Sequence, residues 1–247
     1  MLGKINSKKH LFIITLILAS FSQIGISYAL DVKAAEALKE IEGLFKQPIQ
    51  QRKLSSTQTE LFIKRAETGN GDMKICAIIA LTFAEDSNSL EILKKHASDK
   101  YDAINGVASY ALKVRQVSGR KPDEILRNLC FFLGNSDNQF EKMFLANRMW
   151  VDFKEEAIYT FLDSIQSEPN DIHNFYRCDL FYYLSKSDNP EILKEALKLD
   201  WKESVMITLP DDLAYIMDSI TPGRREDQTG NAIPLIIKNI QKKLGQN

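Results

Sequence analysis

The sequence is poor in the residues that build most catalytic and phosphate-binding turns. Its 247 residues include only 11 glycines and 3 histidines, and no HExxH, GxSxG, GxGxxG or P-loop pattern occurs. Without glycine-rich turns the chain has none of the familiar backbone cradles for a phosphate group. These absences argue against the common metalloprotease, serine hydrolase and nucleotide-binding classes, and the sequence predicts no cofactor and no metal ion.

Cysteine is also scarce. Cys76, Cys130 and Cys178 lie about 50 residues apart, and none belongs to a CxxC motif. This spacing indicates neither a zinc site nor thioredoxin-type chemistry. Because each cysteine lies in a segment with helical periodicity, and buried cysteine behaves as a small hydrophobe, we expect three unpaired thiols. One disulfide and one remaining thiol is the alternative in an oxidising compartment.

Neither sign of charge is in excess, since 32 basic side chains face 33 acidic ones. Binding to nucleic acid depends on basic side chains gathered in a patch or stripe, and none is visible here. Attachment to an anionic membrane surface has the same requirement. The sequence therefore predicts no nucleic-acid partner and no electrostatic binding to lipid.

The N-terminus differs in composition from the rest of the chain. Three lysines precede an apolar run over residues 11–26, and the small residues Ser27 and Ala29 have the spacing of a cleavage site. We interpret residues 1–29 as a secretory signal peptide cleaved after Ala29, followed by one domain over residues 30–247. An uncleaved anchor is the alternative, but the run is shorter than the roughly 20 residues of a spanning helix. We expect a periplasmic or secreted protein with no stable membrane insertion.

After the signal segment, nearly all apolar residues recur at the three-to-four spacing of helices. The tripeptide Glu-Ile-Leu begins at Glu91, Glu124 and Glu191, and a related segment begins near Glu156, which gives intervals of 33, 32 and 35 residues. A period of this size indicates stacked helical hairpins, each burying its apolar face on the next. We predict an all-α fold, a right-handed α-solenoid of about five helical hairpins with N- and C-terminal capping helices. A single helical bundle is the competing fold.

Two of the expected second helices share a small-residue pattern. Ala77, Ala80 and Leu81 in CAIIAL match Ala108, Ala111 and Leu112 in VASYAL at a shift of 31 residues, and Asp72 and Asp102 stand near the openings of these helices. The pattern resembles the short bacterial HEAT-like repeat, which implies an α-solenoid. The resemblance covers about residues 55–117, and later repeats share only the period. Tetratricopeptide repeats are the alternative, although their Trp-x-x-Leu-Gly-x-x-Tyr pattern is absent.

Two segments are candidate partner-binding sites. In FYRCDLFYYL, a helical wheel places Tyr176, Asp179 and Tyr183 opposite the expected core residues, which would form an exposed patch suited to a protein partner. The alternative is that these tyrosines pack between repeats. The polar segment 221–231 contains Arg224 and Arg225, a pair that would clamp a carboxylate or phosphate. A solvated linker is the alternative there.

No set of residues has the spacing of a catalytic site, so we expect no enzymatic activity. Our leading hypothesis is an exported binding or scaffold protein that holds a protein or peptide partner of the envelope on the concave face of a helical array. An immunity-type inhibitor of a toxin is a special case. The alternative is an envelope hydrolase that acts on cell-wall glycan or peptide with carboxylates from different repeats.

The signal-peptide interpretation predicts the mature N-terminus. Intact-mass measurement of protein recovered from the cell envelope should give a chain that begins at Leu30, because the peptidase acts after the small residue Ala29. Protein that retains residues 1–29 in a membrane pellet would contradict this expectation.

Overall fold

The computed structural model describes residues 32–168, 175–200 and 232–246, and all regular structure in these ranges is helical. This confirms the all-α prediction. No helix in the described ranges is long and apolar enough to cross a membrane. The helices are α2 (Val32–Phe45), η1 (Ile49–Gln51), α3 (Ser56–Thr68), α4 (Gly71–Leu81), α5 (Ser87–His96), α6 (Asp102–Val117), α7 (Pro122–Gly134), α8 (Gln139–Phe153), η2 (Lys154–Ala157), α9 (Ile158–Ser167), α10 (Phe175–Lys186), α11 (Pro190–Leu197) and α13 (Ala232–Lys243).

Local capping signals set where these helices begin. Asp86 accepts a hydrogen bond from the Ser89 backbone N–H at 2.8 Å, so α5 begins four residues before Glu91, where the repeat spacing alone would place its start. Proline at the first position of α7 and of α11 starts those helices slightly earlier than predicted. The predicted positions are thus correct to within a few residues, and the caps account for the differences.

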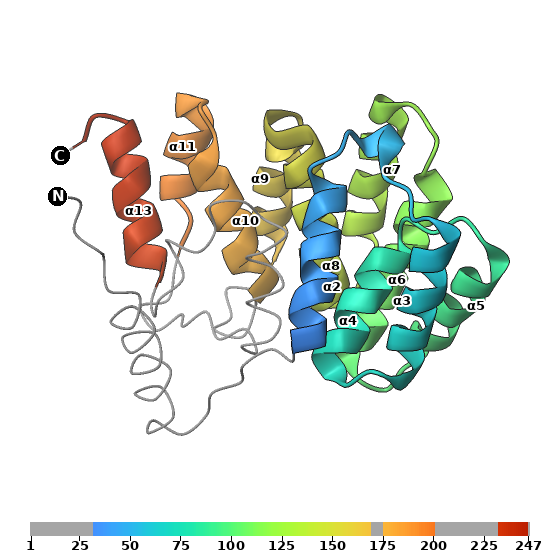
Figure 1. Cartoon of the computed structure of the whole chain (residues 1–247). Helices are drawn as coiled ribbons and strands as arrows, with labels where there is room; N and C mark the ends of the chain where they lie inside the picture. Colours follow the sequence, from blue (N-terminus) through green and yellow to red (C-terminus); the bar gives the residue numbers. More distant parts are fainter. Residues whose placement is uncertain (1–31, 169–174, 201–231, 247) are drawn as a thin grey trace, which may run out of the picture.

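The helices form hairpins that follow one another in space. The pairs α3/α4, α5/α6, α7/α8 and α9/α10 each pack together, and the second members α4, α6, α8 and α10 contact one another in that order. Helix α2 lies against α4 at one end of the row, and α13 lies against α10 and α11 at the other. Figure 1 shows this progression from α3 and α5 to α13.

Second helices are buried on several sides because they contact both their own hairpin partner and the neighbouring second helices. Ala77, Ala80, Ala108 and Ala111 are all completely buried in α4 and α6. Alanine permits close approach of two helix backbones, which explains the small-residue pattern seen in the sequence. In the first helices, the Ile-Leu pairs of the repeated tripeptide turn inward: Ile92, Leu93, Ile125, Ile192 and Leu193 are buried, whereas Leu126 is half-buried.

Polar contacts also join successive hairpins. Lys113 of α6 forms an ion pair with Glu141 of α8, and Lys142 of α8 pairs with Glu168 at 2.6 Å. Within the α5/α6 hairpin, Arg115 of α6 donates to the Ser89 hydroxyl of α5 at 2.8 Å. Each contact joins residues about 26 to 28 positions apart, so it fixes one helix against the next in the row.

Two cysteines have described side chains. Cys76 is completely buried in α4, which agrees with the expected core position. Cys130 of α7 forms no disulfide, and its Sγ atom lies 3.3 Å from the Thr160 hydroxyl of α9. The expectation of an unpaired thiol is confirmed for Cys130, while the side chain of Cys178 lies outside the described residues.

Gly106 of α6 provides a test of how tightly α6 and α8 pack. A Cβ atom on Gly106 would lie 2.5 Å from Asn138 Oδ1 and 2.8 Å from the Glu141 backbone nitrogen. We expect Gly106→Ala to lower the free energy of unfolding by about 1 to 3 kcal/mol, because it overpacks this contact. Gly43→Ala in α2 is the matched control, because a Cβ there meets nothing within 4 Å.

The control should raise stability by about 0.5 to 1 kcal/mol, since alanine restricts the unfolded chain and favours the helix. Urea unfolding of both variants measures the difference. Equal effects at the two glycines would contradict the close approach of α6 to α8.

Candidate anion-binding site

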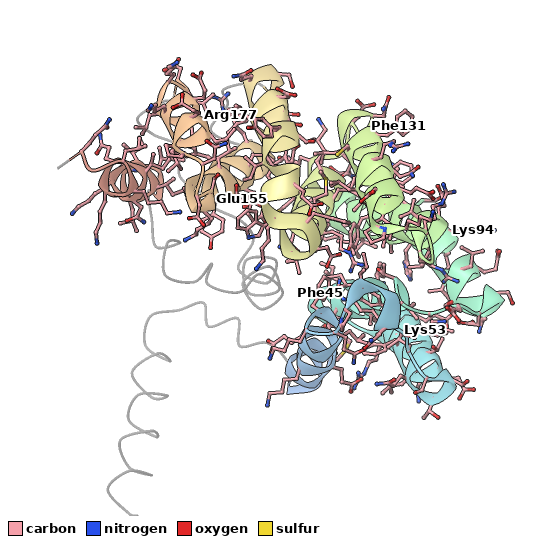
Figure 2. The ribbon with its side chains drawn as sticks, turned by 90° about the horizontal axis from the view of Figure 1, so that it is seen from above. Phe45, Lys53, Lys94, Phe131, Glu155 and Arg177 are labelled. Atoms are coloured by element: carbon pink, nitrogen blue, oxygen red, sulfur yellow. The ribbon has the colours of Figure 1, made fainter. Side chains whose placement is uncertain are left out.

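A cavity of about 270 Å³ lies where several interhelical loops meet. Its walls come from the linker before α3, the α4–α5 loop, the end of α6 with its following turn, α7 and α8. Figure 2 labels Phe45, the last residue of α2, and Lys53, which lies in this linker. The lining residues are Ile49, Arg52, Lys53, Thr82, Phe83, Ala84, Glu85, Val114, Val117, Ser118, Gly119, Arg120, Ile125 and Arg148.

A buried carboxylate holds two of the basic residues beside this cavity. Asp152 Oδ1 lies 2.7 Å from Nη1 of Arg52, and Asp152 Oδ2 lies 2.5 Å from Nε of Arg148. The three side chains are each at most 5% exposed. Two guanidinium groups and one carboxylate leave a net formal charge of +1 in a region that solvent hardly reaches.

The Arg148 guanidinium also packs against a pair of adjoining aromatic rings. Its central carbon is 5.5 Å from the ring centroid of Phe45 and 5.4 Å from that of Phe83, and these rings meet edge to face. An arginine near aromatic rings in a desolvated site is stabilised by attraction between its charge and the ring quadrupole. The rings therefore help to fix the Arg148 side chain beside the cavity.

Arg52 has a different set of partners. Its Nε donates to the Gln47 carbonyl at 2.8 Å, and its Nη2 donates to the Phe45 carbonyl at 3.1 Å. These carbonyl groups lie at and just beyond the end of α2, where backbone acceptors lack helical partners. Burial lowers the pKa of Arg52, and the charge of Arg148 lowers it further, while Asp152 acts in the opposite direction. Arg52 is thus occupied by local partners.

Arg148 and Thr82 retain unused hydrogen-bonding capacity. Arg148 Nη1 and the Thr82 hydroxyl are buried, and neither has a hydrogen-bond partner among the described residues. Both residues line the cavity, and both are no more than 3% exposed. A buried donor without a partner carries a desolvation cost of about 1 to 3 kcal/mol. A ligand with acceptor oxygens would remove that cost.

Exposed charged residues form the rim of the cavity. Lys53 pairs with Glu85 at 2.7 Å, and both side chains are largely exposed. Arg120 is exposed in the turn after α6. The preceding Gly119 has a φ of +83°, a conformation that a residue with Cβ rarely adopts, and it redirects the chain at the end of α6. Arg120, which forms no ion pair within the described residues, adds one formal positive charge at the rim.

The arrangement suits binding of an anion better than metal coordination. In the described ranges, no three His, Cys, Asp or Glu side chains gather in a way that could hold a metal ion. Arginine presents planar N–H donors that match carboxylate or phosphate oxygens. Comparison of the chain with protein-family models, curated proteins and solved structures finds no match. The chemistry of the cavity is therefore inferred from its own residues.

The tyrosine stripe is not a surface patch. Tyr176, Asp179 and Tyr183 are 1%, 3% and 0% exposed, so the prediction of an exposed patch is wrong and the alternative of packing between helices holds. Helix α10 contacts α8, α9, α11 and α13, which leaves no free face for these residues. Tyr183 stacks on Trp150 with ring centroids 5.6 Å apart and accepts a hydrogen bond from Asn147 at 3.2 Å.

The other sequence candidates do not join this site. Arg224, Arg225 and His173 lie outside the described residues. His96 is buried in α5, with its Nδ1 atom 3.8 Å from Asp99. Burial lowers the pKa of His96, and the charge of Lys74 lowers it further. His96 does not line the cavity.

Sequence reasoning missed Arg52, Thr82, Arg148 and Asp152. One signal was present: Arg148 and Asp152 stand four residues apart in NRMWVDF, where apolar residues surround them. Opposite charges at this spacing lie on one helix face, and a charged pair within an apolar run indicates a buried ion pair. Arg52 and Thr82 carry no comparable local signal, because their roles depend on contacts with distant helices.

Loss of the Asp152 charge should strongly destabilise the fold. We expect Asp152→Asn to lower the free energy of unfolding by about 3 kcal/mol or more, because Arg52 and Arg148 would then be buried without a compensating charge. Asp163→Asn on the exposed surface of α9 is the control and should change stability by less than about 0.5 kcal/mol. Similar unfolding midpoints in urea for the two variants would show that the buried ion pairs do not form.

Proposed function

We propose that the chain is an exported, non-enzymatic binding protein that holds an anionic group of a protein or peptide partner in the cavity beside Arg148. One observation carries the proposal: Arg148 lines the cavity, is nearly inaccessible to solvent, and has an Nη1 atom with no hydrogen-bond partner among the described residues. An anion in the cavity would accept a charge-assisted hydrogen bond from this atom.

Electrostatics support an anionic ligand over a neutral or cationic one. Asp152 balances one of the two buried arginines, so the site carries one uncompensated positive charge. Coulomb interactions strengthen when water is excluded, and the Arg148 side chain is only 4% exposed. A bound anion would restore neutrality in the interior.

The same lining supports binding rather than catalysis. Its one carboxylate, Glu85, forms an ion pair with Lys53, and no histidine or cysteine lines the cavity. A glycan hydrolase would need two carboxylates facing each other across a cleft, roughly 5 to 9 Å apart. The cavity offers no such pair, so the binding hypothesis is favoured over the hydrolase alternative.

The scaffold is proposed to be a right-handed α-solenoid of HEAT-like hairpins. Support comes from the serial contacts of α4, α6, α8 and α10 and from the buried alanines of α4 and α6. The second helix of the predicted fifth hairpin falls in residues 201–231, outside the described ranges. Export is proposed from the signal-like composition of residues 1–29. An immunity-type inhibitor in the periplasm remains one form of this function.

Partner capture tests the proposal. Protein purified from the envelope would be immobilised and exposed to envelope extract, with captured proteins quantified by mass spectrometry. We expect Arg148→Met to reduce capture of the partner at least about ten-fold, because loss of one side of a buried charged hydrogen bond commonly costs 2 to 5 kcal/mol. Methionine keeps an extended apolar stem against Phe45 and Phe83.

Arg127→Met is the matched control, because Arg127 is exposed on α7 and does not line the cavity. This variant should capture the partner as well as the natural protein does. Circular dichroism melts of both variants check that they are folded at the temperature of capture. Undiminished capture by folded Arg148→Met protein would exclude the cavity as the partner site.

A further inference from the structure

We infer that the ligand group is a single carboxylate attached to an apolar body, held by Arg148 together with Thr82. This inference rests on the proposed anion-binding function and names the ligand class of the same cavity. It assigns Thr82, at the end of α4, as the second donor of the site. Four features of the cavity lead to it: the Nη1 atom of Arg148, the Thr82 hydroxyl, the net charge and the apolar part of the lining.

The first feature is the orientation of the Arg148 guanidinium. Its Nε atom is engaged by Asp152 at 2.5 Å, while Nη1 is buried beside the cavity with no partner among the described residues. The group is planar, and it packs against the adjoining rings of Phe45 and Phe83. A carboxylate, which is also planar, fits in the plane of the guanidinium and accepts from Nη1.

Thr82 is the second feature. Its side chain lines the same cavity, is 3% exposed, and has a hydroxyl with no hydrogen-bond partner among the described residues. A threonine hydroxyl in an apolar environment normally finds a partner within the protein. A carboxylate has two oxygens with several lone pairs, so it would accept from Arg148 and from Thr82 together.

The third feature is the net charge of the interior. Asp152 neutralises one of the two buried arginines, which leaves a charge of +1 close to Thr82 and Arg148. A monocarboxylate matches this charge, whereas a phosphate dianion would leave one buried negative charge without compensation. Arg120 is exposed at the rim, where solvent weakens its contribution.

The fourth feature is the aliphatic and aromatic part of the lining. It includes Ile49, Phe83, Val114, Val117 and Ile125. The volume of about 270 Å³ is slightly below the roughly 300 to 1,000 Å³ typical of pockets for drug-sized ligands. The cavity therefore suits a small organic acid or the last residue of a peptide with an apolar side chain. Both sources present the same carboxylate and apolar body.

Calorimetric titration of the purified envelope protein tests the inference with defined probes. N-acetyl-leucine carries one carboxylate on an apolar body, and N-acetyl-leucinamide is its neutral counterpart. We expect the acid to bind and the amide to bind at least ten-fold more weakly, or not at all. Inorganic phosphate should bind more weakly than N-acetyl-leucine. Thr82→Val should weaken binding of the acid several-fold.

Stability measurements separate a ligand role for Thr82 from a structural one. Valine has the shape of threonine without the hydroxyl, so Thr82→Val should leave the melting temperature of the unliganded protein unchanged or raise it. Weaker acid binding in a variant of equal or greater stability would support the second-donor role. A lower melting temperature with unchanged acid affinity would overturn it. Arg127→Met again serves as the surface control and should bind N-acetyl-leucine normally.

Two further probes distinguish the source of the carboxylate. Equal affinity for 4-methylpentanoate and N-acetyl-leucine would indicate a free organic acid, whereas tighter binding of longer peptides that end in leucine would indicate a peptide C-terminus. Equal binding of the acid and the amide, or binding of phosphate alone, would overturn the carboxylate inference. If partner capture depends on Arg148 but no small acid binds, the inference fails while the proposed function stands. If neither partner capture nor acid binding depends on Arg148, the proposed function is overturned as well.

Discussion

The carboxylate of Asp152 is the constraint on which the geometry around the cavity depends. It contacts Arg148 on its own helix and Arg52, which lies 96 positions away from Arg148 in a linker near the start of the described chain. These contacts hold the linker between α2 and α3 against α8. In the sequence, two hairpins, α3/α4 and α5/α6, lie between these segments. Because all three groups are almost fully buried, the carboxylate cannot be removed without leaving charge in a poorly solvated region.

This constraint also explains why the site is positive. A carboxylate between two guanidinium groups satisfies the charge of one of them, and Arg52 uses its remaining donors on the carbonyls of Phe45 and Gln47. Arg148 has a hydrogen bond with the Tyr110 side chain and packs against aromatic rings, which attract a cation without accepting strong hydrogen bonds. The two arginines share one carboxylate, and the Nη1 atom of Arg148 is left without a partner among the described residues.

Helix α10 shows why a helical wheel can misplace residues in a row of hairpins, where a helix is covered on more than one face. A surface helix has one apolar face, so the tyrosines opposite Phe181 and Leu184 were expected in solvent. Helix α10 instead lies among four other helices, and Tyr176 and Tyr183 fill the space toward its neighbours. Lys142 lies over the Tyr176 ring at 5.5 Å, and Trp150 stacks on Tyr183. The polar tips of these residues made them resemble surface residues in the sequence.

The sequence by itself determined the helical class, the hairpin period and most helix limits, because these depend on local periodicity, caps and breakers. Asp86, Pro122 and Pro190 act through neighbouring residues, and such short-range effects can be read along the chain. The sequence also contained the Arg148 and Asp152 pair at one-turn spacing. Only the tertiary structure decided that Arg52 meets this pair, that Thr82 faces the same cavity, and that Tyr176 and Tyr183 are covered. Those outcomes depend on which distant helices pack together, and contacts between residues far apart in sequence leave no local pattern from which to predict them.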